Sequence, residues 1–154
     1  MAEPSHPDDG TNGIPINVDE FRHIPDREIT ALFPSTEAAI SAWNESRLVA
    51  ANVTKPRILQ GQEGARILDT HGTEHGLKAR LQRLWQNIGN LENDLAIYGE
   101  GLRKGEALLS FGCSRNVARD LAQLFEQHGG FAIIYFDRFS AARLSGPYGA
   151  ESLD

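Results

Sequence analysis

The pattern of apolar and polar residues predicts four β-strands between residues 27 and 139. They are expected in the stretches REITALFPS from residue 27, PRILQG from 56, EALLSFGC from 106 and FAIIYFDRF from 131. In the first stretch Ile29, Ala31 and Phe33 occupy alternate positions, which is the period of a strand. The third stretch is apolar almost throughout, which is typical of a strand inside a sheet. A turn around Thr54–Pro56 is expected to precede the second strand.

Apolar residues at helical spacing predict four helices. One is expected to follow a cap at Ser35 or Thr36, one to span 77–88, one to span 91–105 and one to follow Ser114. The helix over 77–88 has the clearest apolar stripe, through Leu77, Leu81, Leu84, Trp85 and Ile88. Gly99 and Gly101 weaken the next helix, each costing roughly 1 kcal/mol relative to Ala.

These elements follow the order β-α-β, two helices, β-α-β. Two βαβ units in one sheet form the ferredoxin-like pattern, and the handedness of crossovers favours it. We therefore predict an α+β fold, a ferredoxin-like βαβ-βαβ sandwich with a two-helix insertion between strands 2 and 3. One domain is expected over 27–144. Residues 1–26 and 145–154 hold few apolar side chains and are expected to be flexible. Four apolar residues could dock the N-terminal arm onto the body or onto a partner: Ile14, Ile16, Val18 and Phe21.

The charge balance and the composition make several classes of function improbable. The 154 residues include 15 Lys and Arg against 21 Asp and Glu, a formal net charge of −6, so we do not expect a nucleic-acid binder. The one cysteine, Cys113, cannot form an internal disulfide or a metal site of cysteines alone. The start MAEPSHPDDG does not look like a signal peptide, and no stretch approaches the roughly 18 apolar residues of a membrane span. We expect a cytoplasmic protein without a transmembrane segment.

Residues 91–131 carry a resemblance to a known family. They read LENDLAIYGEGLRKGEALLSFGCSRNVARDLAQLFEQHGGF: an acidic helix with Tyr98, the motif Leu102-Arg103-Lys104-Gly105, a strand, and a helix closing on two glycines. This segment resembles the C-terminal half of bacterial general-stress domains of the heat-induced YflT type. Residues 28–43, with ALFPSTEAAISAW, resemble the opening strand and helix of that family. The resemblance implies the fold and a stress-related or regulatory role, and it carries over no catalytic residue.

The stretch GQEGARILDTHGTEHG, residues 61–76, is the most unusual of the chain because it combines four glycines with two histidines. Asp69, His71 and His75 could bind zinc or another divalent cation, since histidines four apart share one face of a helix. Gly72 and Gly76 argue against a helix there. A third protein ligand, Glu74 or His23, would have to come from the fold.

The same stretch offers two other interpretations. Gly61 and Gly64 could present backbone N–H groups to a phosphate or nucleotide, although no complete phosphate-binding motif is present. The favoured interpretation is a structured connection of consecutive turns after strand 2, with glycines at positive φ.

Cys113 and Arg119 have the C-x5-R spacing of cysteine phosphatases, in CSRNVAR between a strand and a helix. In such enzymes the thiolate attacks phosphorus and the arginine holds the oxygens, and a helix N-terminus lowers the thiol pKa. Against this, the loop has no interior glycine, and Val117 fits the apolar stripe of a helix starting at Ser114. The favoured interpretation is that Cys113 is a small residue at a strand end.

Our leading hypothesis is a non-enzymatic bacterial stress-related or regulatory domain, without a cofactor, that binds a protein partner or a small ligand. A homodimer is expected by analogy with half-exposed sheets that pair through their open face. The alternative is an enzyme or metal- or phosphate-binding protein that uses the 61–76 stretch or the Cys113–Arg119 pair. A third possibility is contact with anionic lipid through Lys78, Arg80 and Arg83.

Overall fold

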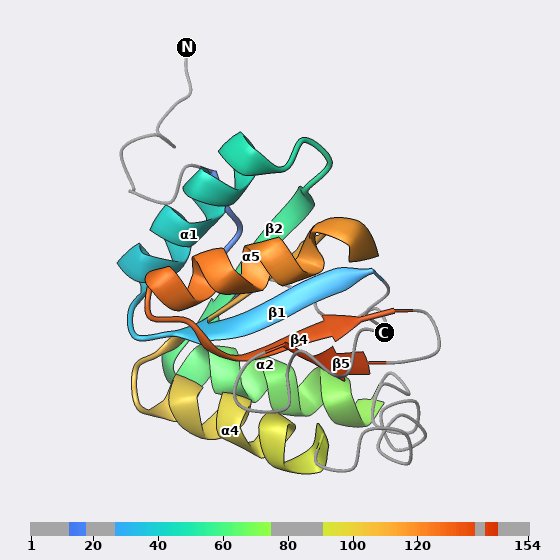
Figure 1. The fold of residues 1–154 in the computed structure, drawn as a ribbon. Coiled ribbons are helices and arrows are strands. Elements are labelled where there is room, and N and C mark those ends of the chain that lie inside the picture. The colour runs from blue at the N-terminus through green and yellow to red at the C-terminus, as the bar shows by residue number, and fades with distance from the viewer. Residues whose placement is uncertain (1–12, 18–26, 75–90, 138–140, 145–154) are drawn as a thin grey trace.

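The computed structural model describes residues 13–17, 27–74, 91–137 and 141–144. Figure 1 shows the arrangement of its helices and strands. In order they are β1 (Glu28–Phe33), α1 (Thr36–Val49), β2 (Thr54–Gln60), α2 (Gly61–Glu74), α4 (Leu91–Arg103), β3 (Ala107–Gly112), α5 (Arg115–Gln127), β4 (Phe131–Phe136) and β5 (Ala141–Arg143).

The strands form one sheet in the order β2-β3-β1-β4-β5, and the neighbouring strands are antiparallel. The order of the first four strands is that of two interleaved βαβ units, since α1 joins β1 to β2 and α5 joins β3 to β4. The predicted α+β fold of ferredoxin-like type is therefore confirmed. The interior position predicted for the apolar strand β3 is also confirmed.

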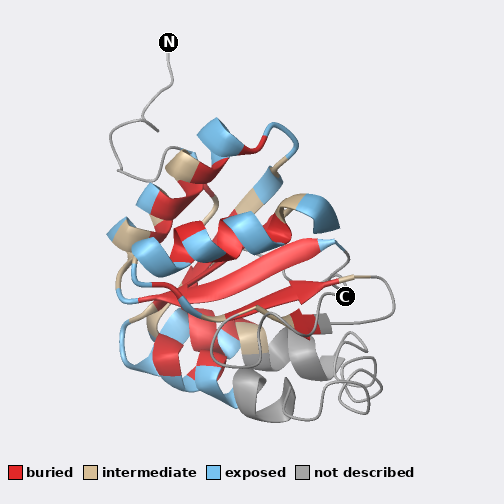
Figure 2. Ribbon diagram, viewed as in Figure 1, coloured by how far each residue is buried: buried red, intermediate tan, exposed pale blue. Residues whose placement is uncertain are grey.

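Helices cover both faces of the sheet. α1 and α5 lie on one face, and α2 and α4 lie on the other (Figure 1). β1 and β3 are consequently buried over nearly their whole length, and α1 and α5 are each buried along one side (Figure 2). The open sheet face from which a homodimer was expected is therefore absent in the described part of the chain.

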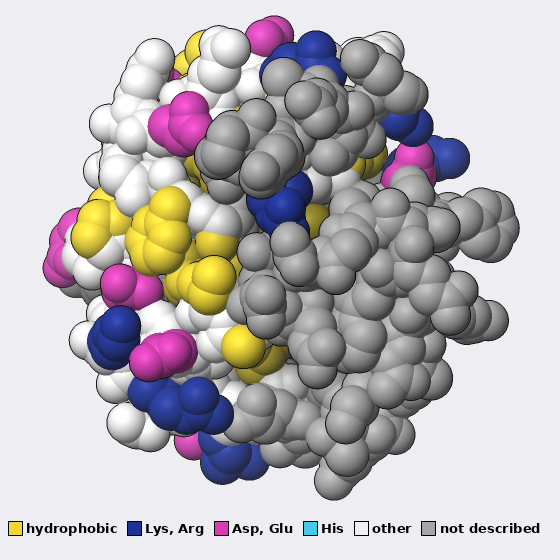
Figure 3. Space-filling model, turned by 60° about the horizontal axis from the view of Figure 1, so that its bottom comes forward, with side chains coloured by type: hydrophobic (Ala, Val, Ile, Leu, Met, Phe, Trp, Pro, Cys, Tyr) yellow, Lys and Arg dark blue, Asp and Glu magenta, His cyan; other side chains and the backbone are white. Residues whose placement is uncertain are grey.

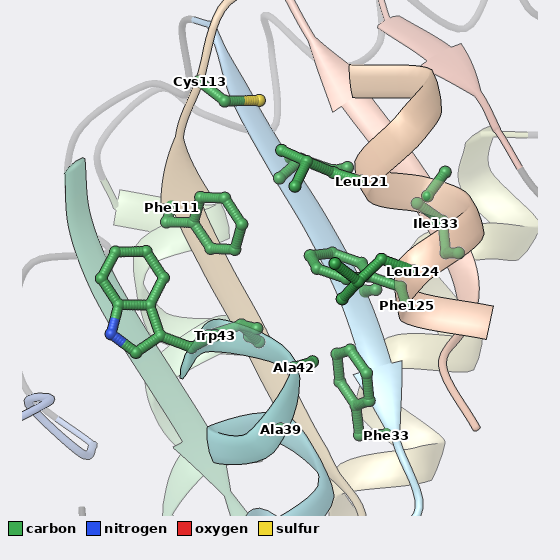
Figure 4. Close-up of a cluster of buried hydrophobic side chains, with 14 of the residues drawn as sticks. Phe33, Ala39, Ala42, Trp43, Phe111, Cys113, Leu121, Leu124, Phe125 and Ile133 are labelled. Carbon is green, nitrogen blue, oxygen red and sulfur yellow. The ribbon is translucent and has the colours of Figure 1, made fainter. Parts of the chain in front are cut away.

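The core between the sheet and the α1/α5 layer is built from aromatic side chains in edge-to-face contact. The ring centroids of Phe33 and Phe125 are 5.2 Å apart, and those of Trp43 and Phe111 are 4.9 Å apart. Figure 4 shows these rings together with Leu121 of α5. Such pairs add to the free energy of burial, and they fix how α1 and α5 sit on the sheet.

Several local predictions are confirmed. Ser35 caps α1, because its Oγ accepts a hydrogen bond from the backbone N–H of Ala38 at 3.1 Å. Ser114 precedes α5 as expected, but its side chain makes no capping hydrogen bond. The helix predicted over 91–105 is present as α4.

Other local predictions are wrong. The turn expected at Thr54–Pro56 is the first part of β2, and β5 was not predicted. The turns expected over 61–76 are replaced, up to residue 74, by helix α2. The helix predicted over 77–88 lies outside the described residues, and the described part of the chain between β2 and β3 includes α2 and α4.

Candidate functional site

Two of the predicted metal ligands lie on helix α2, where turns had been expected. The backbone of Asp69 and His71 belongs to this helix. His75 lies outside the described residues. The described residues hold no group of three or more His, Cys, Asp or Glu side chains placed to bind a metal ion.

Gly61 and Gly64, the predicted phosphate-binding glycines, lie in the first turn of α2. Gly61 has a φ of +67°, which a residue with a β-carbon rarely adopts. A β-carbon on Gly64 would lie 3.0 Å from the carbonyl carbon of Leu59 and 3.0 Å from Oδ1 of Asn17. The glycine at 64 thus allows α2 to pack tightly against the end of β2 and against Asn17, which is a packing role.

Cys113 lies at the end of β3, buried beside the α1/α5 core (Figure 4). Burial, followed by the charge of Glu28, raises the pKa of the thiol from 9.0 to about 12. Its backbone N–H donates to the carbonyl of Arg27 at 3.0 Å, and its own carbonyl accepts from the hydroxyl of Tyr135 at 3.1 Å. A reactive cysteine needs the opposite shift, toward the thiolate.

Arg119 is exposed on α5, which begins at Arg115. The chain between Cys113 and Arg119 is therefore mostly helical, whereas a phosphatase wraps that segment around the phosphate as a loop. The geometry of the described residues favours the structural interpretation of Cys113.

The described structure contains a buried polar cluster that was not predicted from the sequence. Glu28, Thr30, Arg57 and Ser110 lie on three neighbouring strands, β1, β2 and β3, and are buried on the sheet face that α2 and α4 cover. The Arg57 side chain is 3% exposed and the Glu28 side chain 11%. A partial signal was present in β1 and β3, where Glu28, Thr30 and Ser110 are polar positions among apolar ones, but β2 has further polar residues besides Arg57.

Hydrogen bonds join the cluster. Nη2 of Arg57 donates to Oε1 of Glu28 at 2.6 Å and to Oγ of Ser110 at 3.0 Å. The hydroxyl of Thr30 donates to Oγ of Ser110 at 3.1 Å. The charges of Arg57 and Glu28 therefore compensate each other, and the two hydroxyls solvate the pair in place of water. This arrangement holds an ion pair inside the fold and presents no activated nucleophile.

A second polar contact joins the two helices of the α1/α5 layer. Nε2 of His128, at the C-terminal end of α5, lies 2.7 Å from Oε1 of Glu45 in α1. Both side chains are partly exposed. The pair is placed to link the helices across the surface of the layer.

Among the described residues, large hydrophobic side chains are exposed on α1, α4 and β4. Leu48 and Val49, in the last turn of α1, are 84% and 62% exposed. Ile97 of α4 and Phe131 at the start of β4 are also exposed. Figure 3, which brings the α4 side forward, shows hydrophobic side chains gathered there among charged ones.

Comparison of the chain with protein-family models, with curated proteins and with solved structures found no match. Among the described helices, none is both long and apolar enough to cross a membrane.

Proposed function

We propose that the chain is a non-enzymatic binding domain, and that the resemblance of residues 28–43 and 91–131 to general-stress domains reflects a stress-related or regulatory role in a bacterium. The observation that carries the proposal is the placement of polar and apolar groups. The buried ionic cluster of Glu28 and Arg57 compensates itself, whereas Leu48 and Val49 present adjacent apolar side chains to solvent. An exposed apolar pair at a helix end suits a protein partner better than a chemical reaction.

A second copy of the chain is the partner that we test first. Sedimentation velocity over the micromolar range should show a dimer for the native chain and a monomer for Leu48→Lys/Val49→Lys. Ile97→Lys is the matched control, because it removes an exposed apolar side chain from α4 instead of α1. A native chain that stays monomeric throughout would refute the homodimer. A dimer that survives the double substitution would place the interface elsewhere.

A metal site on α2 is the second candidate function. The observation that favours it is that the backbone is helical through His71, which removes the objection that glycines exclude a helix there. Thermal unfolding against zinc, manganese, phosphate, vanadate and nucleotides tests it, because a ligand present at 100 times its Kd stabilises the folded chain by about 2.7 kcal/mol. A zinc shift that disappears in His71→Ala would support this function, and a flat panel would oppose it.

A further inference from the structure

The N-terminal segment Ile14–Asn17 lies along the outer edge of β2 (Figure 1), and Ile16 forms an isolated parallel bridge with Ile58. The backbone N–H of Ile58 donates to the carbonyl of Pro15 at 3.0 Å, and the N–H of Asn17 donates to the carbonyl of Ile58 at 2.8 Å. We refer to residues 14–17 as the strap. Since β2 is an edge strand, the strap satisfies backbone groups that would otherwise invite another strand.

The side chain of Asn17 extends this pairing by one residue. Its Nδ2 donates to the carbonyl of Gln60 at 3.1 Å, and its Oδ1 accepts from the N–H of Gln60 at 2.8 Å. The amide group thus takes the place of a further strand residue. Asn17 has a φ of +55°, a left-handed conformation that asparagine tolerates better than most residues.

The strap also contacts both helical layers. Ile14 is 4% exposed and packs into the α1/α5 core. On the other side of the sheet, Gly64 of α2 lies close enough to Asn17 that a β-carbon would be 3.0 Å from its Oδ1. Gln60, which Asn17 holds, also contacts Thr36 at the start of α1 through its side chain. These contacts fix the strap at one position along the edge of β2.

The remainder of the β2 edge is a poor template for a strand. Pro56 has no backbone N–H to donate. Lys55 has a φ of +56°, and the pairing register shifts between Thr54 and Arg57, as in a bulge that ends regular pairing. Strand addition is thus confined to Ile58 and Gln60, the two residues that the strap occupies.

We propose that the edge of β2 at Ile58 and Gln60 is a strand-docking site that the chain closes with its own strap, and that its occupant in trans is the strap of a second copy. The bonds on which the strap rests are few, so it opens at a much lower free energy than the sheet. A second copy carries the same Ile14 and Asn17, so reciprocal exchange restores every contact that opening breaks. This inference rests on the homodimer proposed above and adds strap exchange to it as a second contact beside that of Leu48 and Val49.

The test compares amide hydrogen exchange in the native chain and in full-length Ile14→Asp/Asn17→Gly. Glycine accommodates the left-handed backbone at 17 and removes the side chain that bonds to Gln60. The amides of Ile58 and Gln60 should exchange at least about tenfold faster in the variant, while that of Leu109 in β3 stays as slow as before. Asn44→Gly, in the middle of α1, is the control, and should leave the amides of Ile58 and Gln60 protected.

An acetylated and amidated peptide of residues 13–17, GIPIN, tests the occupant. It should bind the full-length variant and restore slow exchange at Ile58 and Gln60, and the peptide GIPIG should not. In sedimentation, excess GIPIN should convert the native dimer to monomer.

Unchanged exchange at Ile58 and Gln60, or faster exchange throughout the sheet, would overturn the inference, because the strap would then not be a separable element. A dimer that persists in excess GIPIN would overturn strap exchange and leave the homodimer standing through another surface. A native chain that is monomeric at all concentrations would overturn the second copy as the occupant, together with the homodimer.

Discussion

Arg57 and Glu28 bring two opposite charges into a part of the sheet with almost no access to water. Removing one partner leaves the other buried without its countercharge, which is far more costly than removing both. We expect Arg57→Leu to lower the free energy of unfolding by about 3–5 kcal/mol. The double variant Glu28→Leu/Arg57→Leu should recover most of that loss, as measured by urea unfolding.

A double-mutant cycle with Glu28→Leu separates the ion pair from the packing of Arg57. If the effects of the two single substitutions simply add, the pair contributes no coupling, and the stabilising role assigned to the cluster is wrong. Ser110→Ala is a useful companion variant, because it removes one hydrogen bond to Arg57 and leaves the charges in place.

Cys113 gives the protein a pH dependence on the alkaline side. In the unfolded chain the thiol loses its proton near its ordinary pKa of 9.0, whereas the folded chain retains it up to a pKa of about 12. The stabilisation from this group is thus complete below pH 9.0 and is lost as the pH rises toward about 12. Unfolding free energies measured above pH 9.0 should fall more steeply for the native chain than for Cys113→Ala.

The Tyr135 hydroxyl adds a loss of stability at higher pH, because burial raises its pKa from 10.0 to about 12. The unfolding free energies of the native chain and of Cys113→Ala should therefore begin to diverge between pH 9.0 and 10.0, before Tyr135 contributes. Iodoacetamide provides an independent check. Native Cys113 should react slowly at pH 8 and unfolded Cys113 rapidly, and rapid native alkylation would restore the case for a reactive thiol.

At the scale of elements, the two glycines of α4 have different roles. A β-carbon at Gly101 would lie 2.8 Å from Cδ1 of Leu32 and would also collide with the carboxylate of Glu106. At Gly99 the nearest atom would be Nη1 of Arg103, at 3.3 Å, at the end of a flexible side chain. The glycine at 101 thus allows α4 to approach β1, while the one at 99 only weakens the helix.

We expect Gly99→Ala to raise the free energy of unfolding by up to about 1 kcal/mol. Gly101→Ala should lower it, because the overlap with Leu32 outweighs the gain in helix propensity. Thermal unfolding of the two variants against the native chain measures both effects. Equal stabilisation by both substitutions would show that α4 does not pack against β1 as closely as described.

Glycine and proline account for two of the errors in the predicted elements, and the shortness of β5 accounts for a third. Glycine in 61–76 suggested turns, but Gly64 is required because α2 packs against Leu59 and Asn17, a contact between elements that the local sequence does not reveal. Pro56 suggested a turn, yet β2 tolerates it beside an irregular stretch of an edge strand. β5 has three residues, too few for a periodic signal.

At the scale of the whole molecule, the order of the strands was predictable because apolar periodicity and crossover handedness leave few topologies. The second helical layer was not predictable, because the local sequence does not show which face of the sheet α2 and α4 pack against. The buried cluster was also not predicted, because it too depends on contacts between residues far apart in the sequence. Arg57 and Ser110 are 53 residues apart in sequence, and only the pairing of β2 with β3 brings them together.

The two helical layers differ in how they are held, and this predicts two steps of opening. The α1/α5 layer rests on interlocked aromatic rings. The α2/α4 layer covers a sheet face that includes the polar cluster of Glu28 and Arg57. Part of that face therefore contributes little hydrophobic stabilisation, although Tyr98 of α4 donates to the carbonyl of Ala132 at 2.6 Å. We expect α4 to open at a lower free energy than the sheet.

Native-state hydrogen exchange in low denaturant resolves the two steps. Leu102→Ala in α4 should lower both the free energy at which α4 opens and that of global unfolding, by about 2–5 kcal/mol. Leu121→Ala in α5 should lower the global value by a similar amount and leave the opening of α4 unchanged, because Leu121 stays packed in the partly open state. Both leucines are fully buried, so the comparison is matched. If both substitutions shift the exchange of α4 and β1 equally, the molecule opens as a single cooperative unit.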